Sequence, residues 1–449
     1  MRHLILICLL LPLLLKSQDA IPVFESGKEG HKIYRIPAIL GLPNGNLLAF
    51  AEGRVQNSAD FGDINLVMKK SMDQGKSWSV LQILVDVDKL QAGNPAPVVD
   101  LFDPSYPNGV VYLFYNTGNN HENEIRKGHG IREVWYIKSV DMGETWSVLQ
   151  ILVDVDKLQA GNPAPVVDLF DQSYPNGVVY LFYNTGNNHE NEIRKGHGIR
   201  EVWYIKSVDM GETWSDPVNI TSQVHRPFHQ AYNFKEDWRS YANTPGHGFQ
   251  FMEGKYKGRI FIAANHSQGE PQNEFRDYHA HGYYTDDHGK TFHLSENIAL
   301  KGSNEAIGAA LSGDRMIMNI RNQSGDIRNR MIAYSSNGGE KWDTVFFNND
   351  LIDPVCQGSI LGIGEKKGKM VLASSNPADA LKRDNLMIKI SYDEGITWPK
   401  SMLVDKSSSG YKGDWSAYSD LVLLNKNTIG ILYERNNYSE IVFKGVKIK

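Results

Sequence analysis

A turn-like motif of eight residues recurs along the chain, and this repeat constrains the fold more than any other feature. Its form is Ser/Thr-x-Asp-x-Gly-x-Ser/Thr-Trp, with small departures in two copies. Aspartate accepts hydrogen bonds from nearby backbone N–H groups, glycine supplies a positive φ, and tryptophan can pack under a hairpin. We therefore expect every copy to be a structural turn, because equivalent turns rarely all meet one ligand. The six copies begin at Ser71, Ser139, Ser207, Thr285, Ser335 and Ser391.

The segments between these turns have the pattern of β-hairpins. Pro43–Asn46 precedes the apolar run 47–50, and Pro107–Gly109 precedes the apolar run 110–114. No long stretch has apolar residues at helical spacing. Repeats of about 50 to 80 residues that each hold several strands are typical of a β-propeller. The sequence therefore predicts an all-β fold, with blades that bury their faces against their neighbours.

Composition excludes several other classes of protein. The 449 residues carry a formal net charge of −5, which does not suggest a nucleic-acid-binding protein. Hydrophobic residues make up 41% and charged residues 22%, so the chain has enough apolar material for a large core.

The amino terminus has the pattern of a signal peptide. Arg2 and His3 precede an apolar run from Leu4 to Leu15, which is short for a membrane span of about 20 residues. We predict a signal peptide over residues 1–20, secretion to an extracellular or periplasmic location, and no stable membrane insertion. Residues 21–449 would form the mature domain, in which Cys356 would have no cysteine partner.

Two adjacent segments are almost identical. Residues 79–146 and 147–214 match at 67 of 68 positions and differ only at Pro104 and Gln172. This identity exceeds what diverged blades show, so the duplication is recent or artefactual. Each copy runs from one turn motif to the next, so the unit is in register to add a blade. Extrusion or misfolding of the extra copy is the alternative.

The turn motifs resemble the Asp boxes of the sialidase superfamily. The resemblance implies a six-bladed β-propeller with the boxes away from the active site, and the duplicated 68-residue unit would add a seventh blade or be extruded. It covers nearly all of residues 30–449 and implies a catalytic domain over 21–449. Members of this family ordinarily have one Gly-Asn-Pro-Ala-Pro-Val-Val-Asp segment, whereas this chain has two, ending at Asp100 and Asp168.

Three arginines stand in contexts similar to those of the family. Tyr34-Arg35-Ile36-Pro37 resembles its amino-terminal arginine motif, with Tyr in place of the commoner Phe; Arg321 and Arg383 lie in the two later positions. Planar guanidinium groups bind carboxylates through charge-assisted, often paired hydrogen bonds. The resemblance implies that these three arginines bind the carboxylate of sialic acid. A single arginine would more often be a surface ion-pair residue.

Tyr418, in Ser-Ala-Tyr-Ser-Asp-Leu, matches the family's tyrosine motif and is the nucleophile that the resemblance implies. A neutral phenol approaches a carbon that bears a carboxylate with less repulsion than another carboxylate would. Because a phenol has a pKa of about 10, it needs a nearby base. Glu305 matches the glutamate that serves this purpose.

The remaining candidates lie on both sides of this pair. Asp60 is the candidate acid/base, which would protonate the leaving oxygen and then activate water; Asp63 is its nearest rival and is better read as structural. The family places Arg54 near the ring substituents of the substrate, and Glu434 beside the first arginine. No histidine pair, including His279 and His281, has the spacing of a zinc site, so we predict no metal and no cofactor.

The leading hypothesis is a retaining exo-sialidase, a glycoside hydrolase acting on terminal α-linked sialic acids of glycoproteins, glycolipids and oligosaccharides. A trans-sialidase, including an intramolecular one, would use the same residues. A catalytically impaired, sialic-acid-binding propeller is the alternative from another class, because a seventh blade could separate Arg35 from Arg321 and Arg383.

Overall fold

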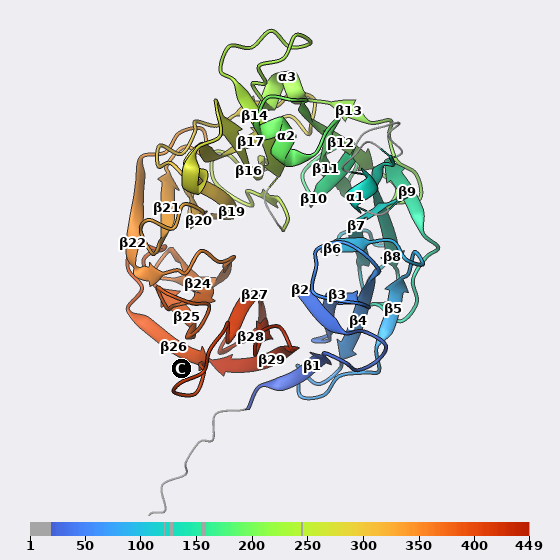
Figure 1. Cartoon of the computed structure of the whole chain (residues 1–449), viewed down its shortest axis with the longest axis vertical. Helices are drawn as coiled ribbons and strands as arrows, with labels where there is room; N and C mark the ends of the chain where they lie inside the picture. The colour runs from blue at the N-terminus through green and yellow to red at the C-terminus, as the bar shows by residue number, and fades with distance from the viewer. Residues whose placement is uncertain (1–18, 121, 126–128, 154–158, 244–245, 449) are drawn as a thin grey trace, which may run out of the picture.

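The computed structural model describes residues 19–120, 122–125, 129–153, 159–243 and 246–448. Antiparallel sheets stand around a central axis like blades (Figure 1), so the prediction of an all-β propeller is confirmed. No helix within the described ranges is long and apolar enough to cross a membrane. Most of the predicted signal peptide lies outside the described residues. The helices are short: α1 Glu122–Ile125, α2 Glu190–Arg194, α3 Thr221–Val224 and the 3-10 helix η1 Asn273–Phe275.

The described strands form seven blades, numbered here along the chain. Blade 1 holds β2 Ile33–Gly41, β3 Leu47–Arg54, β4 Ile64–Ser71 and β5 Gln82–Val85. Blade 2 holds β6 Ala92–Asp100, β7 Val110–Gly118, β8 Arg132–Ser139 and β9 Gln150–Val153. Blade 3 holds β10 Gln159–Asp168, β11 Val178–Gly186, β12 Arg200–Ser207 and β13 Val218–Asn219. Blade 4 holds β14 Trp238–Asn243, β15 Phe249–Gln250, β16 Ile260–Gln268, β17 Tyr278–Thr285 and β18 His293–Leu294.

The last three blades complete the ring. Blade 5 holds β19 Ser303–Ala310, β20 Met316–Asn322, β21 Asn329–Ser335 and β22 Thr344–Ile352. Blade 6 holds β23 Ser359–Lys366, β24 Lys369–Pro377, β25 Leu386–Ser391 and β26 Lys400–Asp405. Blade 7 holds β27 Ser416–Asn425, β28 Thr428–Arg435, β29 Glu440–Lys447 and the amino-terminal strand β1 Ile21–Glu25. Because β1 pairs with β29, the two ends of the described chain close the ring together.

The duplicated unit forms an additional blade. Blades 2 and 3 are each antiparallel, and the only pairing given between them in the described chain is a parallel bridge from Gln159 to Arg132. The ring therefore has seven blades instead of the six that the resemblance alone implies, and of the two outcomes expected for the duplicated unit it adds a blade and is not extruded. The physical reason is that the unit spans one turn motif to the next and brings both of its apolar faces with it.

The core is divided among the contacts between neighbouring blades. Side chains alternate between the two faces of a strand, so Val111 and Leu113 of β7 pack on blade 1, whereas Tyr112 and Phe114 pack on blade 3. Each of the seven buried clusters joins residues of two adjacent blades in the same way. Every blade is therefore stabilised from both sides.

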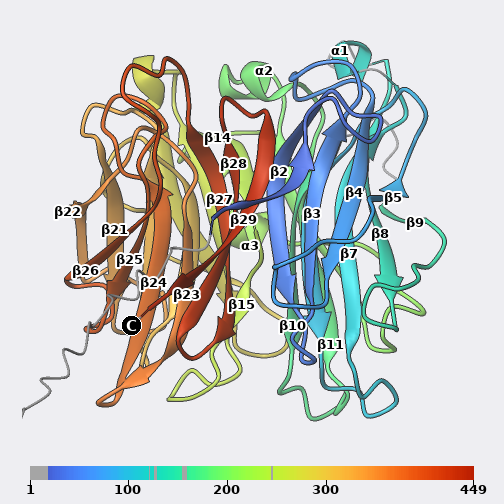
Figure 2. The ribbon, with the colours of Figure 1, turned by 90° about the horizontal axis from the view of Figure 1, so that it is seen from below.

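The Asp-box turns have the structural role that was predicted. In the first copy, Asp73 Oδ1 accepts hydrogen bonds from the N–H groups of Lys76 and Ser77, and the N–H of Gly75 donates to Ser71 Oγ. In blade 1 this turn follows the far end of β4, opposite the end at which β2 begins and β3 stops. Figure 2 shows the strands of the ring running between these two faces. The boxes therefore lie away from the face that carries the predicted site.

Candidate active site

A cavity of about 800 Å³ opens on the face where β2 begins. Four of the predicted site residues that line it come from different blades: Arg35 from blade 1, Glu305 from blade 5, Arg383 from blade 6 and Tyr418 from blade 7. Arg35, Glu305 and Tyr418 lie on the first strands of their blades, and Arg383 lies in the loop between β24 and β25, so residues remote in the sequence meet in one cavity.

Bulges in these inner strands position the key side chains. The register of β19 shifts between Ser303 and Ala306, so Glu305 lies within the irregular segment. The register of β27 shifts between Ser416 and Ser419 around Tyr418, and that of β2 shifts directly after Arg35. A β-bulge bends the strand and changes the direction of a side chain. Local irregularity therefore aims all three side chains at the same place.

Guanidinium groups surround Tyr418. The Cζ atoms of Arg35 and Arg383 lie 5.5 and 5.7 Å from the centroid of its ring. Arg321 is 9% exposed and reaches the cluster through Glu305, to which its Nη1 donates a hydrogen bond of 2.7 Å. The structure thus brings together the three arginines that the sequence singled out.

Glu434 organises one side of the cluster. Its Oε1 accepts hydrogen bonds from Arg35 Nε at 2.6 Å and from the N–H of Ile36 at 3.0 Å, while its Oε2 accepts from the N–H of Tyr418 at 3.2 Å. Ile36 has a φ of 56°, which is strained for a β-branched residue. A wholly buried carboxylate therefore fixes the arginine, the strained backbone beside it and the tyrosine strand together.

The electrostatics around Tyr418 keep its phenol protonated at neutral pH. Burial raises the pKa of Tyr418 well above its ordinary value, and the negative charge of Glu305 adds to this increase. The positive charges of Arg321 and Arg383 act in the opposite direction. The phenol can therefore become a nucleophile only if its proton is removed as it reacts, and Glu305 is the carboxylate placed nearby.

Asp60 and Arg54 lie on the blade 1 side of the same cavity. Arg54 is buried, donates to Glu52 Oε2 at 2.6 and 3.1 Å, and pairs with Asp60 Oδ1 at 2.9 Å. The side chain of Asp60 is 81% exposed. Its rival Asp63 is not among the described residues that line the cavity. Asp60 is therefore an exposed carboxylate that lines the cavity and is paired with a buried arginine.

Sequence reasoning missed Tyr438. The Cζ atom of Arg35 lies 4.4 Å from its ring centroid, Arg383 Nη1 donates to its hydroxyl at 3.1 Å, and that hydroxyl donates to Asp414 Oδ2 at 2.9 Å. Tyr438 thus supports two arginines of the trio at once. No pattern in the sequence signals it, because it lies in the turn between β28 and β29.

The inserted blade does not divide this cluster. The arginines, Tyr418, Glu305 and Glu434 lie on blades 5, 6, 7 and 1, which are consecutive around the ring. Blades 2, 3 and 4 occupy the rest of the ring, with the duplicated blades 2 and 3 next to blade 1 (Figure 1). The separation of Arg35 from Arg321 and Arg383 that an added blade could have caused is therefore not observed.

Among the described residues, no group of three or more His, Cys, Asp or Glu side chains is arranged to hold a metal ion. The described cysteine, Cys356, is free and buried.

Fold and cavity together define a class of protein: a β-propeller built from Asp-box repeats, with an arginine-rich cavity at one end of its axis. The family model described as BNR repeat-like domain matches residues 149–432, more than half of the chain. The chain therefore belongs to the BNR repeat-like sialidase superfamily.

Known sialidases match most of the chain at low identity. A sialidase of Micromonospora viridifaciens is 27% identical over 91% of this chain and 51% of its own length. A sialidase of Bacteroides fragilis is 25% identical over 97% of this chain and 66% of its own length. An exo-α-sialidase of Arthroderma benhamiae is 24% identical over 92% of this chain and 80% of its own length. The chain thus spans only about half of the first of these relatives and two thirds of the second.

Solved structures share the fold. A Hadza microbial sialidase aligns with a TM-score of 0.56 at 22% identity, over 96% of this chain and 68% of that one. The intramolecular trans-sialidase of Ruminococcus gnavus aligns with a TM-score of 0.55 at 17% identity, over 95% and 97% of the two chains.

Proposed function

We propose that this protein is a retaining exo-sialidase, which releases terminal α-linked sialic acid from glycoproteins, glycolipids and oligosaccharides through a covalent tyrosyl intermediate. The observation that carries the proposal is the position of the Arg35 and Arg383 guanidinium groups, 5.5 and 5.7 Å from the centroid of the Tyr418 ring, with the charge of Glu305 acting on the same phenol. No cofactor takes part.

Binding would begin with the substrate carboxylate. Arg35, Arg321 and Arg383 would donate charge-assisted hydrogen bonds to it, which places the anomeric carbon against Tyr418. The anchoring of Arg35 on Glu434 and of Arg383 on Tyr438 limits the side-chain entropy lost on binding.

Two proton transfers would accompany the bond changes in each of the two steps. As the Tyr418 oxygen bonds to the anomeric carbon, Glu305 takes the phenolic proton, and Asp60 gives a proton to the departing oxygen. In the second step Asp60 takes a proton from water, whose oxygen bonds to the anomeric carbon while the bond to tyrosine breaks and Glu305 returns its proton to the Tyr418 oxygen. Two inversions leave the configuration retained.

The test uses a fluorogenic sialoside and the variants Tyr418→Phe and Tyr392→Phe. Tyr392 lies at the Asp-box face and serves as the control. We expect Tyr418→Phe to lower kcat by about a thousandfold or more, the scale on which loss of a catalytic nucleophile acts, and Tyr392→Phe to be nearly unchanged. A fluorinated sialosyl fluoride that traps the intermediate should label the peptide containing Tyr418. Full activity of Tyr418→Phe, or labelling elsewhere, would refute the assignment.

Two other functions give different outcomes in the same assays. A trans-sialidase would release the fluorophore but yield a transferred or intramolecularly linked sugar instead of free sialic acid, which NMR of the products distinguishes. An impaired binding propeller would bind sialosides without releasing fluorophore. The unbroken cluster on blades 5 to 1 favours catalysis over binding alone.

A further inference from the structure

The cavity extends beyond the arginine and tyrosine cluster onto the two copies of the duplicated unit. Arg132 begins β8, Arg200 begins β12, and both line the cavity. They occupy equivalent positions, 68 residues apart, in the two copies. A ring with one copy would carry one such arginine. The duplication therefore gives this arc of the cavity a second guanidinium group.

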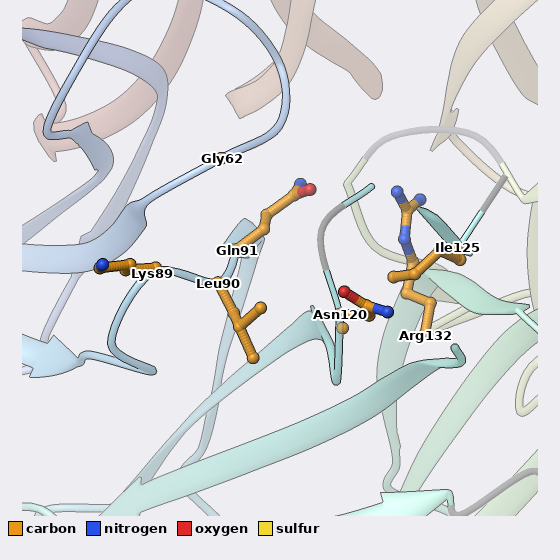
Figure 3. Close-up of a pocket in the computed structure, with 8 residues that line it drawn as sticks. Gly62, Lys89, Leu90, Gln91, Asn120, Ile125 and Arg132 are labelled. Carbon is orange, nitrogen blue, oxygen red and sulfur yellow. The ribbon is translucent and has the colours of Figure 1, made fainter. Parts of the chain in front are cut away.

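The surroundings of Arg132 are suited to a carboxylate. Figure 3 shows the side chains of Gln91 and Arg132 beside a small pocket of blade 2, and both residues also line the large cavity. An amide N–H₂ and a guanidinium are donors that match carboxylate oxygens. Arg132 is partly exposed, whereas Arg200 is 9% exposed. Arg132 is thus the more accessible of the two.

This second arginine group lies on a different arc from the first. Arg321 and Arg383 belong to blades 5 and 6, and Arg35 to the innermost strand of blade 1, whereas Arg132 and Arg200 begin the third strands of blades 2 and 3. One carboxylate held against Tyr418 would not also be held by blades 2 and 3. A cavity of about 800 Å³ lies toward the upper end of the range of about 300–1,000 Å³ for ligand sites, so it has room for more than one sugar ring.

We propose that Arg132, assisted by Gln91 and Arg200, forms a subsite for a second carboxylate, and that the substrates are oligosaccharides ending in two sialic acids. The terminal residue would lie at Tyr418, and the carboxylate of the penultimate residue would lie at Arg132. This inference rests on the proposed function, because it assumes a sialoside at Tyr418. It assigns to the duplicated blade a role in substrate selection.

The experiment compares a disialyl lactose with a monosialyl lactose as substrates of the full chain and of the variants Arg132→Gln and Arg200→Gln. We expect Arg132→Gln to lower kcat/KM for the disialyl substrate by about tenfold or more, a loss typical of one charge-assisted contact. The value for the monosialyl substrate should change by less than about twofold. Arg200→Gln should have a smaller effect in the same direction. Equal losses on both substrates, or none on the disialyl one, would overturn the proposal.

A matched control and a second readout complete the design. Arg276→Gln removes an arginine that is not among the described cavity-lining residues and pairs with Glu274 and Asp326. It should leave both substrates unaffected. Binding of the two oligosaccharides is also measured in a Tyr418→Phe background, where Arg132→Gln should weaken only the disialyl complex. If the wild type hydrolyses neither sugar, the proposed function fails, while the binding comparison still decides whether the subsite exists.

Discussion

At the scale of single residues, the geometry of the site depends on side chains that hold other residues of the site in position. Glu434 accepts three hydrogen bonds and so links Arg35, Ile36 and Tyr418. The strain at Ile36 persists because the carboxylate fixes its N–H. Such an arrangement keeps the arginine in place before a ligand arrives, which is what electrostatic preorganisation requires.

Three buried histidines make the stability of the fold depend on pH. His225, His266 and His281 lie in and beside blade 4, and burial lowers the pKa of each, that of His281 to about 3. In the unfolded chain these rings titrate near pH 6.5. The unfolded state therefore binds more protons below that pH, and stability is retained above about pH 6.5 and lost as the pH falls.

His225→Leu tests this mechanism, because neither ring nitrogen of His225 has a hydrogen-bond partner in the described structure. The ring packs 4.6 Å from that of Tyr241, with the charge of Arg226 nearby. We expect the variant to be as stable as the wild type at pH 7.5. Between pH 6 and 4 its free energy of unfolding should fall less steeply, by about 1.4 kcal/mol per pH unit for one proton. Urea denaturation across this range measures the slope, and an unchanged slope would contradict the mechanism.

Sequence could predict the charged members of the site but not all of its supports. Arg35, Glu305 and Tyr418 stand in short sequence patterns that resemble those of the sialidase family, so they could be singled out before the structure was known. Tyr438 stacks on Arg35 and bonds to Arg383 only because the β28–β29 turn folds over them. A turn residue of this kind acquires its role from tertiary packing, which no local pattern encodes.

At the scale of elements, the two copies show how a neighbour changes the environment of an identical strand. Asp168 Oδ1 accepts a hydrogen bond from Gln250 Nε2 at 2.7 Å, and its Oδ2 lies 2.7 Å from His288 Nδ1. The equivalent Asp100 faces blade 3 instead of blade 4, and its Oδ2 has no partner in the described structure. Burial raises the pKa of Asp100 to about 6, against a hydrogen bond from the N–H of Phe102 that lowers it.

The contact between the copies carries a second unsatisfied group. Tyr180 donates a hydrogen bond of 2.6 Å to the carbonyl oxygen of His288, whereas the hydroxyl of the equivalent Tyr112 has no partner in the described structure. At these two equivalent positions, the boundary between blades 2 and 3 leaves unsatisfied the groups that the boundary between blades 3 and 4 satisfies.

Replacing the twin aspartates by asparagine should have opposite effects. The folded-state pKa of Asp100 exceeds its unfolded value of about 3.9, so this group costs stability as the pH rises from about 4 to about 6. Asp100→Asn should raise the free energy of unfolding at pH 7 by about 1–3 kcal/mol and change it little at pH 4. Asp168→Asn should lower it by about 1–3 kcal/mol, because two bonded partners lose the charge they contact.

Urea denaturation of both variants at the two pH values checks this prediction. Each variant serves as the control for the other, since the two positions have the same sequence context. Equal losses at Asp100 and Asp168 would show that the neighbouring blade does not decide the outcome.

At the scale of the whole molecule, the chain has the residues that a six-bladed ring without one copy of the duplicated unit would need for its contacts. Blade 2 faces blade 1 with Val111, Leu113 and Tyr115, and blade 3 faces blade 2 with the identical Val179, Leu181 and Tyr183. Lys70 of blade 1 pairs with Glu144 as Lys138 pairs with Glu212. Blade 3 could therefore pack directly on blade 1 with the residues that blade 2 uses now.

Deletion of residues 79–146 should consequently give a folded six-bladed protein. We expect a cooperative thermal transition at a temperature equal to or above that of the full chain, because the poorly satisfied contact between the copies is removed. Circular dichroism and small-angle scattering measure this, and the fluorogenic assay should still report activity. Deletion of residues 147–214 leaves a chain that differs from the first deletion product at one position only, with Pro104 in place of Gln172. The two deletion products should therefore be equally stable and active. Deletion of 343–398, a unit without a twin, is the control that should not fold; aggregation of all three would contradict the expectation.

The architecture was predictable, whereas the number of blades was not. The sequence of each Asp box predicts a turn because its own side chains make the hydrogen bonds of that turn, as Ser71 and Asp73 do. Whether a second copy of a blade enters the ring depends on the match between faces such as those of Tyr112 and Tyr183. Such a match is a property of packing in three dimensions.

The pairing of β1 with β29 orders events during synthesis. The first strand of the described chain completes the last blade, so it has no partner until the ribosome has made β29. Until then blade 7 lacks one of its strands and the ring cannot close. Closure of the ring is therefore the last step of assembly, and it depends on contact between the two ends of the described chain.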